Sequence, residues 1–247
     1  MSLYSIKRWL ILKAMKTFTT SINRAIYRND ERRINILIRD KIDLNQPDIF
    51  SYSPFLVASS IGNSKILKML FEANVDQQKR PDDGSSPLIL AVDSGKYDAV
   101  EYLISLNLFN FDETDNCGIT PLILACGIGS MDIVQLLLNH GADVNHRAHS
   151  QGETPLNSSI VNGGHKKIVE LLLKRGAKVD VANIYGLTPL MHAARNGHEE
   201  IIKMLVEYGA DLTPKDNMGI TALRWAELKM HKNIYRYLEN QINNKNK

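Results

Sequence analysis

Residues 120–145 read TPLILACGIGSMDIVQLLLNHGADVN and carry the start and stop signals of two short helices. The Thr120 hydroxyl can cap free backbone N–H groups, and Pro121 suits a first helical turn, where its missing donor has no cost. Gly129 permits a sharp turn into the second helix, MDIVQLLLNH, and Gly141 supplies the left-handed residue that ends it. The stretch therefore predicts one helix–turn–helix unit.

The same signals return at a fixed interval along the chain. Successive helix-opening prolines are 33 or 34 residues apart, each follows a Ser or Thr, and each is followed eight residues later by a glycine. A period near 33 is typical of a repeat architecture. The prolines are Pro54, Pro87, Pro121, Pro155 and Pro189, the glycines are Gly62, Gly95, Gly129, Gly163 and Gly197, and Thr221-Ala222-Leu223 continues the series.

These repeats resemble the ankyrin repeat family through SPLILAVDSGKYDAVEYL, TPLILACGIGSMDIVQLLLNHGADVN, GHKKIVELLLKRGAKVD and TPLMHAARNGHEEIIKMLVEYGAD. The resemblance implies an all-α fold, an ankyrin-repeat solenoid of about seven helix–turn–helix repeats with connecting β-hairpin-like loops and degenerate terminal caps. We expect one ankyrin repeat domain over 15–247. Its repeats are expected at about 15–47, 48–80, 81–114, 115–148, 149–182, 183–215 and 216–247.

Three departures from the repeat pattern lead to local expectations. Asn74 and Asn107 replace the exit glycine, and asparagine also tolerates the left-handed conformation. Gly163-Gly164-His165 carries one extra residue between two helices, which predicts a local bulge. The histidine that often follows Thr-Pro-Leu in the family is absent, so packing is expected to hold more of the register between repeats. Its positions hold Leu56, Ile89, Ile123, Asn157, Met191 and Arg224.

The start of the chain is basic and has two interpretations. Residues 1–14 are expected to form a basic N-terminal capping helix that covers the first repeat, because terminal units of repeat arrays are usually atypical. Alternatively, residues 1–29 act as a mitochondrial transit segment, since six Lys or Arg residues precede the first acidic residue, Asp30.

Composition narrows the class of protein. The 247 residues carry a formal net charge of +3, which by itself gives no reason to expect a nucleic-acid partner. The two cysteines exclude a disulfide framework and favour a reducing compartment, so the expected localisation is cytoplasmic. An apolar run such as residues 9–12 is far too short to span a membrane.

Catalytic and metal-binding patterns are weak. The sequence contains no H-E-x-x-H, Walker loop or G-x-S-x-G motif, which predicts a non-enzymatic protein without a cofactor or small-molecule substrate. Cys117, His146 and His149 lie on the loops around the fourth repeat and form the alternative, a metal or enzymatic site. Zinc normally takes four well-spaced ligands, and the Gly-His steps at His165 and His198 resemble the interhelical turns of the family.

Function should reside on the surface that the repeat leaves variable. In the ankyrin family, loop tips and the solvent side of the first helices line a concave groove, and the resemblance implies that this groove binds another protein. Many of these positions are apolar, as interaction surfaces often are. The predicted partner-binding residues are Ile49, Phe50, Tyr52, Ile61, Asp82, Asp83, Ile119, Ile128, Gln151, Ile184, Tyr185, Leu187 and Met218.

Two alternatives to groove binding stay open at this stage. The chain could be a structural subunit fixed within a larger multiprotein assembly. Its second helices and turns also carry a basic outer face that could contact acidic protein or RNA. The basic residues are Lys65, Lys68, Lys96, Lys166, Lys167, Lys174, Arg175 and Lys203.

Overall fold

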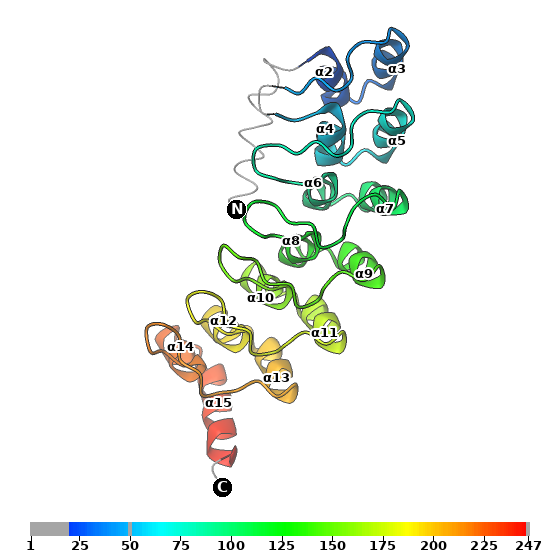
Figure 1. Cartoon of the computed structure of the whole chain (residues 1–247). Coiled ribbons are helices and arrows are strands. Elements are labelled where there is room, and N and C mark those ends of the chain that lie inside the picture. Colours follow the sequence, from blue (N-terminus) through cyan, green and yellow to red (C-terminus); the bar gives the residue numbers. More distant parts are fainter. Residues whose placement is uncertain (1–19, 49–50, 246–247) are drawn as a thin grey trace. The chain divides into compact units, whose positions relative to one another are not determined.

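The computed structural model describes residues 20–48 and 51–245, and these residues form fourteen α-helices and no strand (Figure 1). The predicted all-α fold is therefore confirmed. The expected capping helix at 1–14 lies outside the described residues, as does most of the proposed transit segment. Packing divides the chain into two compact units, residues 1–109 and 110–247.

Unit 1 contains three helix pairs in its described part. The first helices pack on one another in the order α2, α4, α6, and α5 packs on α7. Each pair joins a first helix to a second helix through a short turn. The elements are α2 (Ser21–Tyr27), α3 (Glu31–Arg39), α4 (Pro54–Ile61), α5 (Ser64–Glu72), α6 (Pro87–Ser94) and α7 (Tyr97–Ser105).

Unit 2 contains four helix pairs. Figure 1 shows α8, α10, α12 and α14 in one row and α9, α11 and α13 in a second row, with the connecting loops projecting past the first row. The last helix has 14 residues, whereas the other second helices have nine. The elements are α8 (Pro121–Ile128), α9 (Met131–Asn139), α10 (Pro155–Val161), α11 (Lys166–Lys174), α12 (Pro189–Asn196), α13 (Glu199–Glu207), α14 (Ala222–Leu228) and α15 (Lys232–Lys245).

The hydroxyl residues cap the first helices as their positions predict. Thr120 Oγ1 accepts a hydrogen bond from the backbone N–H of Ile123 at 3.2 Å, and Pro121 takes the first helical position. This satisfies one of the donors that a helix leaves free at its N-terminus. The same cap is formed by Ser53, Ser86, Thr154, Thr188 and Thr221, and Thr20 caps the degenerate first repeat.

The left-handed turns also follow the sequence, with one correction. Gly62, Gly129 and Gly197 end their first helices with positive φ, and Asn74 and Asn107 adopt positive φ as expected. In the fifth repeat α10 ends one residue early, its C-cap Asn162 is right-handed, and Gly164 rather than Gly163 has the positive φ of 62°. The extra residue therefore moves the left-handed position by one.

The core of each unit lies between its helices. Ile133, Val134 and Leu137 of α9 are fully buried, and so are Leu122 and Cys126 of α8. Burial raises the pKa of the Cys126 thiol, so this cysteine stays uncharged and packs as a small apolar side chain.

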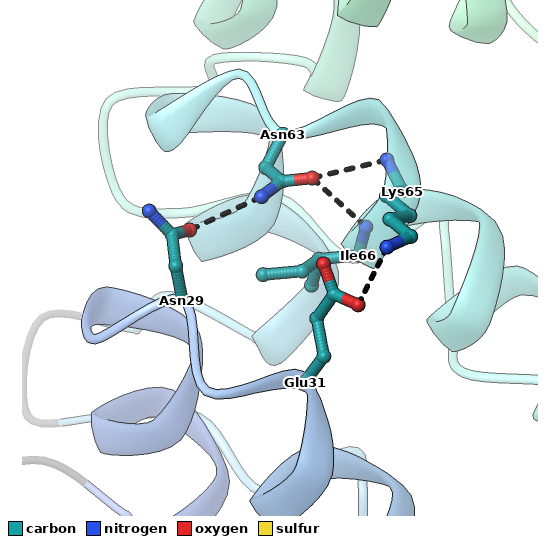
Figure 2. A network of polar contacts seen from close by, with 5 residues as sticks. All are labelled: Asn29, Glu31, Asn63, Lys65 and Ile66. Atoms are coloured by element: carbon teal, nitrogen blue, oxygen red, sulfur yellow. Dashed lines mark hydrogen bonds and ion pairs between the residues drawn. The ribbon is translucent and has the colours of Figure 1, made fainter.

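Polar contacts between repeats add to the packing that the sequence predicted. In unit 1, Asn63 Nδ2 donates to Asn29 Oδ1 at 3.1 Å, and Lys65 pairs with Glu31 at 2.8 Å (Figure 2). Asn63 Oδ1 also accepts from the backbone N–H groups of Lys65 and Ile66 and so caps α5. One asparagine therefore starts a helix and joins two repeats.

Side chains of the exit loops make a second set of links. In unit 2, Asn145 Oδ1 accepts from the backbone N–H of Lys178 at 2.8 Å, and its Nδ2 donates to the carbonyl of Gly176 at 3.1 Å. Asn157, at the place of the missing family histidine, donates to the Val181 carbonyl at 3.1 Å. Register between these repeats thus rests on hydrogen bonds as well as on packing.

The Gly-His steps are packing contacts between successive repeats. A Cβ built on Gly129 would lie 2.3 Å from Cε1 of His165, and one on Gly164 would lie 2.4 Å from Cε1 of His198. Each imidazole therefore lies directly against the backbone of the preceding repeat, which only glycine permits.

Candidate functional site

The loop tips of unit 2 are held in shape by their own first residue. Asn183 Oδ1 accepts from the backbone N–H groups of Tyr185 and Leu187 at 3.0 and 3.1 Å. Asp216 Oδ1 makes the same pair of bonds with Met218 and Ile220, both at 2.9 Å. Such side chain to backbone bonds fix a tight turn. The side chains at the tips are therefore presented from ordered backbone.

Successive tips are also bonded to one another. Asn217 donates from its backbone N–H to the carbonyl of Tyr185 and from Nδ2 to the carbonyl of Ile184, both at 3.0 Å. The backbone N–H of Ile184 in turn donates to the carbonyl of Gln151 at 3.0 Å. Three neighbouring loops thus form one connected platform.

Exposed apolar side chains in unit 2 occupy two kinds of position, the ends of first helices and the loop tips. Ile128, Val161 and Leu228 are the last residues of α8, α10 and α14, and all three are exposed. Ile184, Tyr185 and Met218 are exposed at the loop tips, Tyr185 at 55% and Met218 at 69%. We call these six residues the tip surface. They are more than half of the large hydrophobic side chains that are exposed in the described part of the chain.

The structure separates the predicted partner-binding residues into groups. Of these residues, Ile128, Ile184, Tyr185 and Met218 are members of the tip surface. Asp82 and Gln151 are exposed, whereas Ile61, Asp83 and Ile119 are half-buried. Tyr52 and Leu187 are buried, and Ile49 and Phe50 lie outside the described residues.

Tyr52 and Leu187 need a correction, because each is only 7% exposed. The backbone N–H of Tyr52 donates to Asp48 Oδ1 at 3.0 Å, and its carbonyl accepts from Asn23 Nδ2 at 3.3 Å. Burial, followed by the nearby Asp83 carboxylate, raises the pKa of the Tyr52 hydroxyl. This tyrosine therefore helps to hold unit 1 together and offers a partner little surface.

A cation lies beside the tip surface. The Arg195 guanidinium carbon lies 5.1 Å from the centre of the Trp225 ring, and Arg195 itself is exposed. Trp225 is held in place because its indole N–H donates to Asp216 Oδ2 at 2.9 Å. A guanidinium stacked on a fixed ring is pre-oriented to donate to a carboxylate.

A buried polar network lies behind the same loops. Asn183 Nδ2 donates to Glu153 Oε1 at 3.2 Å and lies 3.4 Å from Nε2 of His192. The second oxygen of Glu153 is buried without a hydrogen bond, and burial raises the pKa of this carboxyl. Burial, with a contribution from Arg195, lowers the pKa of His192 to about 4. At neutral pH the imidazole is therefore uncharged.

The alternative metal site is not assembled. Within the part of the chain that the structure describes, no three His, Cys, Asp or Glu side chains are grouped so that they could hold a metal ion. The His149 ring is instead 3.1 Å from the carbonyl of Asn116, a contact between two loop tips. Cys117, His146 and His149 thus do not form the proposed cluster.

Within the described residues, four of the eight basic residues assigned to the outer face pair with an acid, Lys65 among them. Lys166 pairs with Glu200 at 2.9 Å, and Lys174 pairs with Glu170 at 2.6 Å on the same helix. Lys203 makes a 2.7 Å pair on α13. Each exposed pair places an acid beside a lysine, so fewer unpaired cations are left for an acidic protein or RNA than the list of basic residues suggested.

Helix pairs at a period near 33 residues, joined by bonded loop tips, define an ankyrin repeat protein. The family model described as "Ankyrin repeats (3 copies)" matches residues 22–110, 105–183 and 178–247, so the chain belongs to the ankyrin repeat family. Ankyrin repeats are generally protein–protein interaction modules and are in general not enzymes.

An ankyrin repeat protein of Fowlpox virus (strain NVSL) is 35% identical over 112 residues, which is 45% of this chain and 33% of that protein. The chain thus matches about a third of the length of this relative. The crystal structure of the ankyrin repeat domain of Bcl-3, described as a unique member of the IkappaB protein family, has a TM-score of 0.73. It is 22% identical, and the match covers 88% of this chain and 98% of that one. This likeness confirms the fold.

No helix within the described residues is long and apolar enough to cross a membrane.

Sequence reasoning missed two members of the tip surface, Val161 and Leu228. Both are the last residue of a first helix, seven residues after the capping threonine, and this shared offset could have identified them. It also missed Met230, which lies eight residues after Ala222, where the five proline-led first helices have glycine and the first repeat has Asn29. Met230 has a left-handed φ of 58° and is 82% exposed.

Proposed function

We propose that this chain is a non-enzymatic binding protein that holds a partner protein against the tip surface of unit 2. The observation that carries the proposal is the gathering of exposed Ile, Val, Leu, Met and Tyr side chains at loop tips and first-helix ends. Ile184, Tyr185 and Met218 lie on two loop tips that are hydrogen-bonded to each other, and neighbouring exposed apolar side chains usually mark an interaction site. Solubility alone would favour polar residues at these positions.

The order of the loops supports the same proposal. Tyr185 and Met218 lie on neighbouring tips that are hydrogen-bonded to each other, so little backbone freedom is lost when a partner binds. Tyrosine buries a large area with few rotatable bonds, which suits it to be an anchor. Arg195 adds a cation at the edge for a carboxylate of the partner.

The proposal also places the protein in the cytoplasm. Cys117 and Cys126 are both unbonded, which supports a reducing environment such as the cytoplasm. A scaffold role fits the same surface, since a bound protein would be held without being changed.

Affinity purification followed by mass spectrometry tests the proposal. The wild-type chain, the Tyr185→Ala, Met218→Ala double variant and a control double variant, Lys166→Ala with Lys174→Ala, are used as baits in parallel. The proposal expects a protein that is recovered with the wild type and the lysine variant but lost with the tip variant. Loss with the lysine variant and retention with the tip variant would place binding on the outer face instead.

A further inference from the structure

One cation interrupts the row of apolar side chains at the first-helix ends of unit 2. Val161 and Leu228 lie seven residues after the capping threonines of α10 and α14, and both are exposed. At the same offset α12 has Arg195, which is exposed as well. The first helices pack on one another in the order α8, α10, α12, α14, so these side chains lie on successive helices (Figure 1). From Ile128 onward the order along the row is therefore apolar, apolar, basic, apolar.

Arg195 is oriented by its neighbours but is not neutralised by them. Its guanidinium carbon lies 5.1 Å from the centre of the Trp225 ring on the next first helix. The carboxylate behind that ring is Asp216, and both of its oxygens already accept hydrogen bonds, Oδ1 from two backbone N–H groups and Oδ2 from the indole. In the part of the chain that the structure describes, no ion pair involves Arg195.

This free charge restricts what can cover the row. A partner that covers a guanidinium and offers it no acceptor buries an unpaired charge, which strongly disfavours binding. A carboxylate at the same place forms charge-assisted hydrogen bonds with the guanidinium instead. The row therefore selects a partner that is apolar along most of its contact face and acidic at one point, opposite Arg195.

The width of the surface fits an α-helix. Ile184, Tyr185 and Met218 lie on the loops that precede α12 and α14, whereas Val161 and Leu228 end α10 and α14. The two parts of the tip surface are thus at opposite ends of the first helices, and a helix of seven or eight residues is about 11 to 12 Å long. An α-helix with its side chains is about 10 to 12 Å across, so one helix can contact both parts.

The interval between repeats fits the same occupant. Packed helices lie about 8 to 10 Å apart, so side chains at one offset recur at that interval along the row. In an α-helix, residues seven positions apart share a face and lie about 10.5 Å apart. Residues on one face of an extended strand recur at about 6.6 Å and fall out of register with the row. A polyproline II segment also repeats at about 9 Å, and the width of the surface favours the helix over it.

We propose that the protein held by the tip surface presents an amphipathic α-helix whose apolar residues recur every seven positions and include one Asp or Glu that pairs with Arg195. This inference rests on the proposed function and adds the chemistry of the partner. The apolar residues of that helix pack against Ile128, Val161 and Leu228 on one side and against the loop tips on the other. The single acid fixes the register of the helix along the row, because shifting it by one repeat would leave Arg195 without an acceptor.

A peptide-display selection on the full chain tests this partner class. The library consists of helical peptides of about three heptads in which the positions of one face are randomised. Selection should enrich apolar residues at most of these positions and Asp or Glu at one of them. Synthetic peptides with the enriched sequence should bind in fluorescence anisotropy, and replacing the acid by Lys should weaken binding by about tenfold or more.

A charge swap assigns the acid to Arg195. Arg195→Glu should bind the Lys peptide more tightly than the acidic peptide, and Arg195→Gln should show no preference between the two. The matched control is Lys167→Glu on α11, which also reverses an exposed cation that forms no ion pair within the described residues and should keep the acidic preference. Melting temperatures of the variants, compared with the wild type, show that the fold is kept.

The inference and the proposed function can fail separately. Selection that yields no helical peptides, or an acidic preference that survives Arg195→Glu, overturns the inference. If the natural partner is lost with the Tyr185→Ala, Met218→Ala bait but is fully retained with Arg195→Glu, the proposed function stands and the acidic helix does not. A partner that is retained with the Tyr185→Ala, Met218→Ala bait overturns both.

Discussion

Asn183 Nδ2 donates to Glu153 Oε1 at 3.2 Å and so ties the loop before α10 to the loop before α12. The bond satisfies only one of the two carboxylate oxygens, and the other is buried without a partner. A buried acceptor that lacks a hydrogen bond loses its hydration without compensation. The link between Asn183 and Glu153 therefore carries a desolvation free energy that depends on pH.

Glu153→Gln should stabilise the chain at neutral pH by about 1 kcal/mol, because it removes the charge that burial disfavours. The pKa of Glu153 is raised in the folded state, so its charged form penalises folding at pH values above that pKa. Below the ordinary glutamate pKa both states are neutral, and the gain should vanish. Urea denaturation at pH 7 and pH 4 measures it, and equal stability of the two proteins at pH 7 would contradict the argument.

His192 should make the fold sensitive to acid. Its folded pKa of about 4 lies below the ordinary value of 6.5, so the unfolded chain takes up the proton first as pH falls. The stability that the neutral imidazole provides is complete above about pH 6.5 and is lost towards pH 4, by about 3 kcal/mol. In His192→Gln the loss over this range should be smaller by that amount. Parallel curves for the two proteins would show that His192 titrates normally.

Much of the fold could be predicted because its signals are local. Thr120, Pro121 and Gly129 act within one turn of the chain, so their roles can be read without any tertiary contact. The exposure of a side chain could not be predicted in this way, since it depends on which residues pack against that side chain in the folded protein. Tyr52 and Tyr185 both looked like surface tyrosines in the sequence, yet Tyr52 is buried and Tyr185 is 55% exposed. The candidate site was therefore predicted only in part.

Two further features were beyond sequence reasoning for the same reason. The lysines of the outer face were visible, but the pairing of Lys166 with Glu200 joins α11 to α13 and needs the three-dimensional packing of these helices. The extra residue at Gly163-Gly164 was visible too, but which glycine takes the left-handed position depends on where α10 ends.

Leu137→Ala should destabilise unit 2 by about 2 to 5 kcal/mol, because Leu137 is fully buried and alanine leaves a cavity. The matched control is Leu136→Ala on the same helix, where the leucine is only half-buried and the loss should be smaller. Chemical denaturation of both variants gives the comparison. A change in the free energy of unfolding below about half a kcal/mol for Leu137→Ala would show that Leu137 is not part of the core.

Gly129→Ala should cost more stability than Gly141→Ala, although both glycines lie in the same repeat and have positive φ of 82° and 89°. Both substitutions should destabilise the fold by about 1 kcal/mol or more, because alanine is strained in left-handed backbone. A Cβ on Gly129 also meets Cε1 of His165 at 2.3 Å, whereas one on Gly141 meets nothing within 4 Å. The difference in free energy of unfolding isolates the contact with the next repeat. Equal losses would mean that His165 moves aside freely.

The two tyrosines should behave in opposite ways when each is replaced by alanine. Tyr52→Ala is expected to lower the stability of unit 1 by about 3 kcal/mol, because it empties a buried site and removes a packed ring. Tyr185→Ala is expected to change stability by less than about 0.5 kcal/mol, since its side chain is exposed.

Loss of partner binding should follow the reverse order, with the larger effect at Tyr185, once a partner has been recovered. Tyr185→Ala together with Met218→Ala is expected to weaken the complex by about 2 kcal/mol or more while the helical signal and melting temperature hold, which titration calorimetry and circular dichroism can measure. Tyr52→Phe keeps the ring in the core and serves as the control that should preserve both folding and binding. If Tyr52→Phe abolished binding in a folded chain, the hydroxyl of unit 1 would be part of the contact surface, and the tip surface of unit 2 would not account for recognition alone.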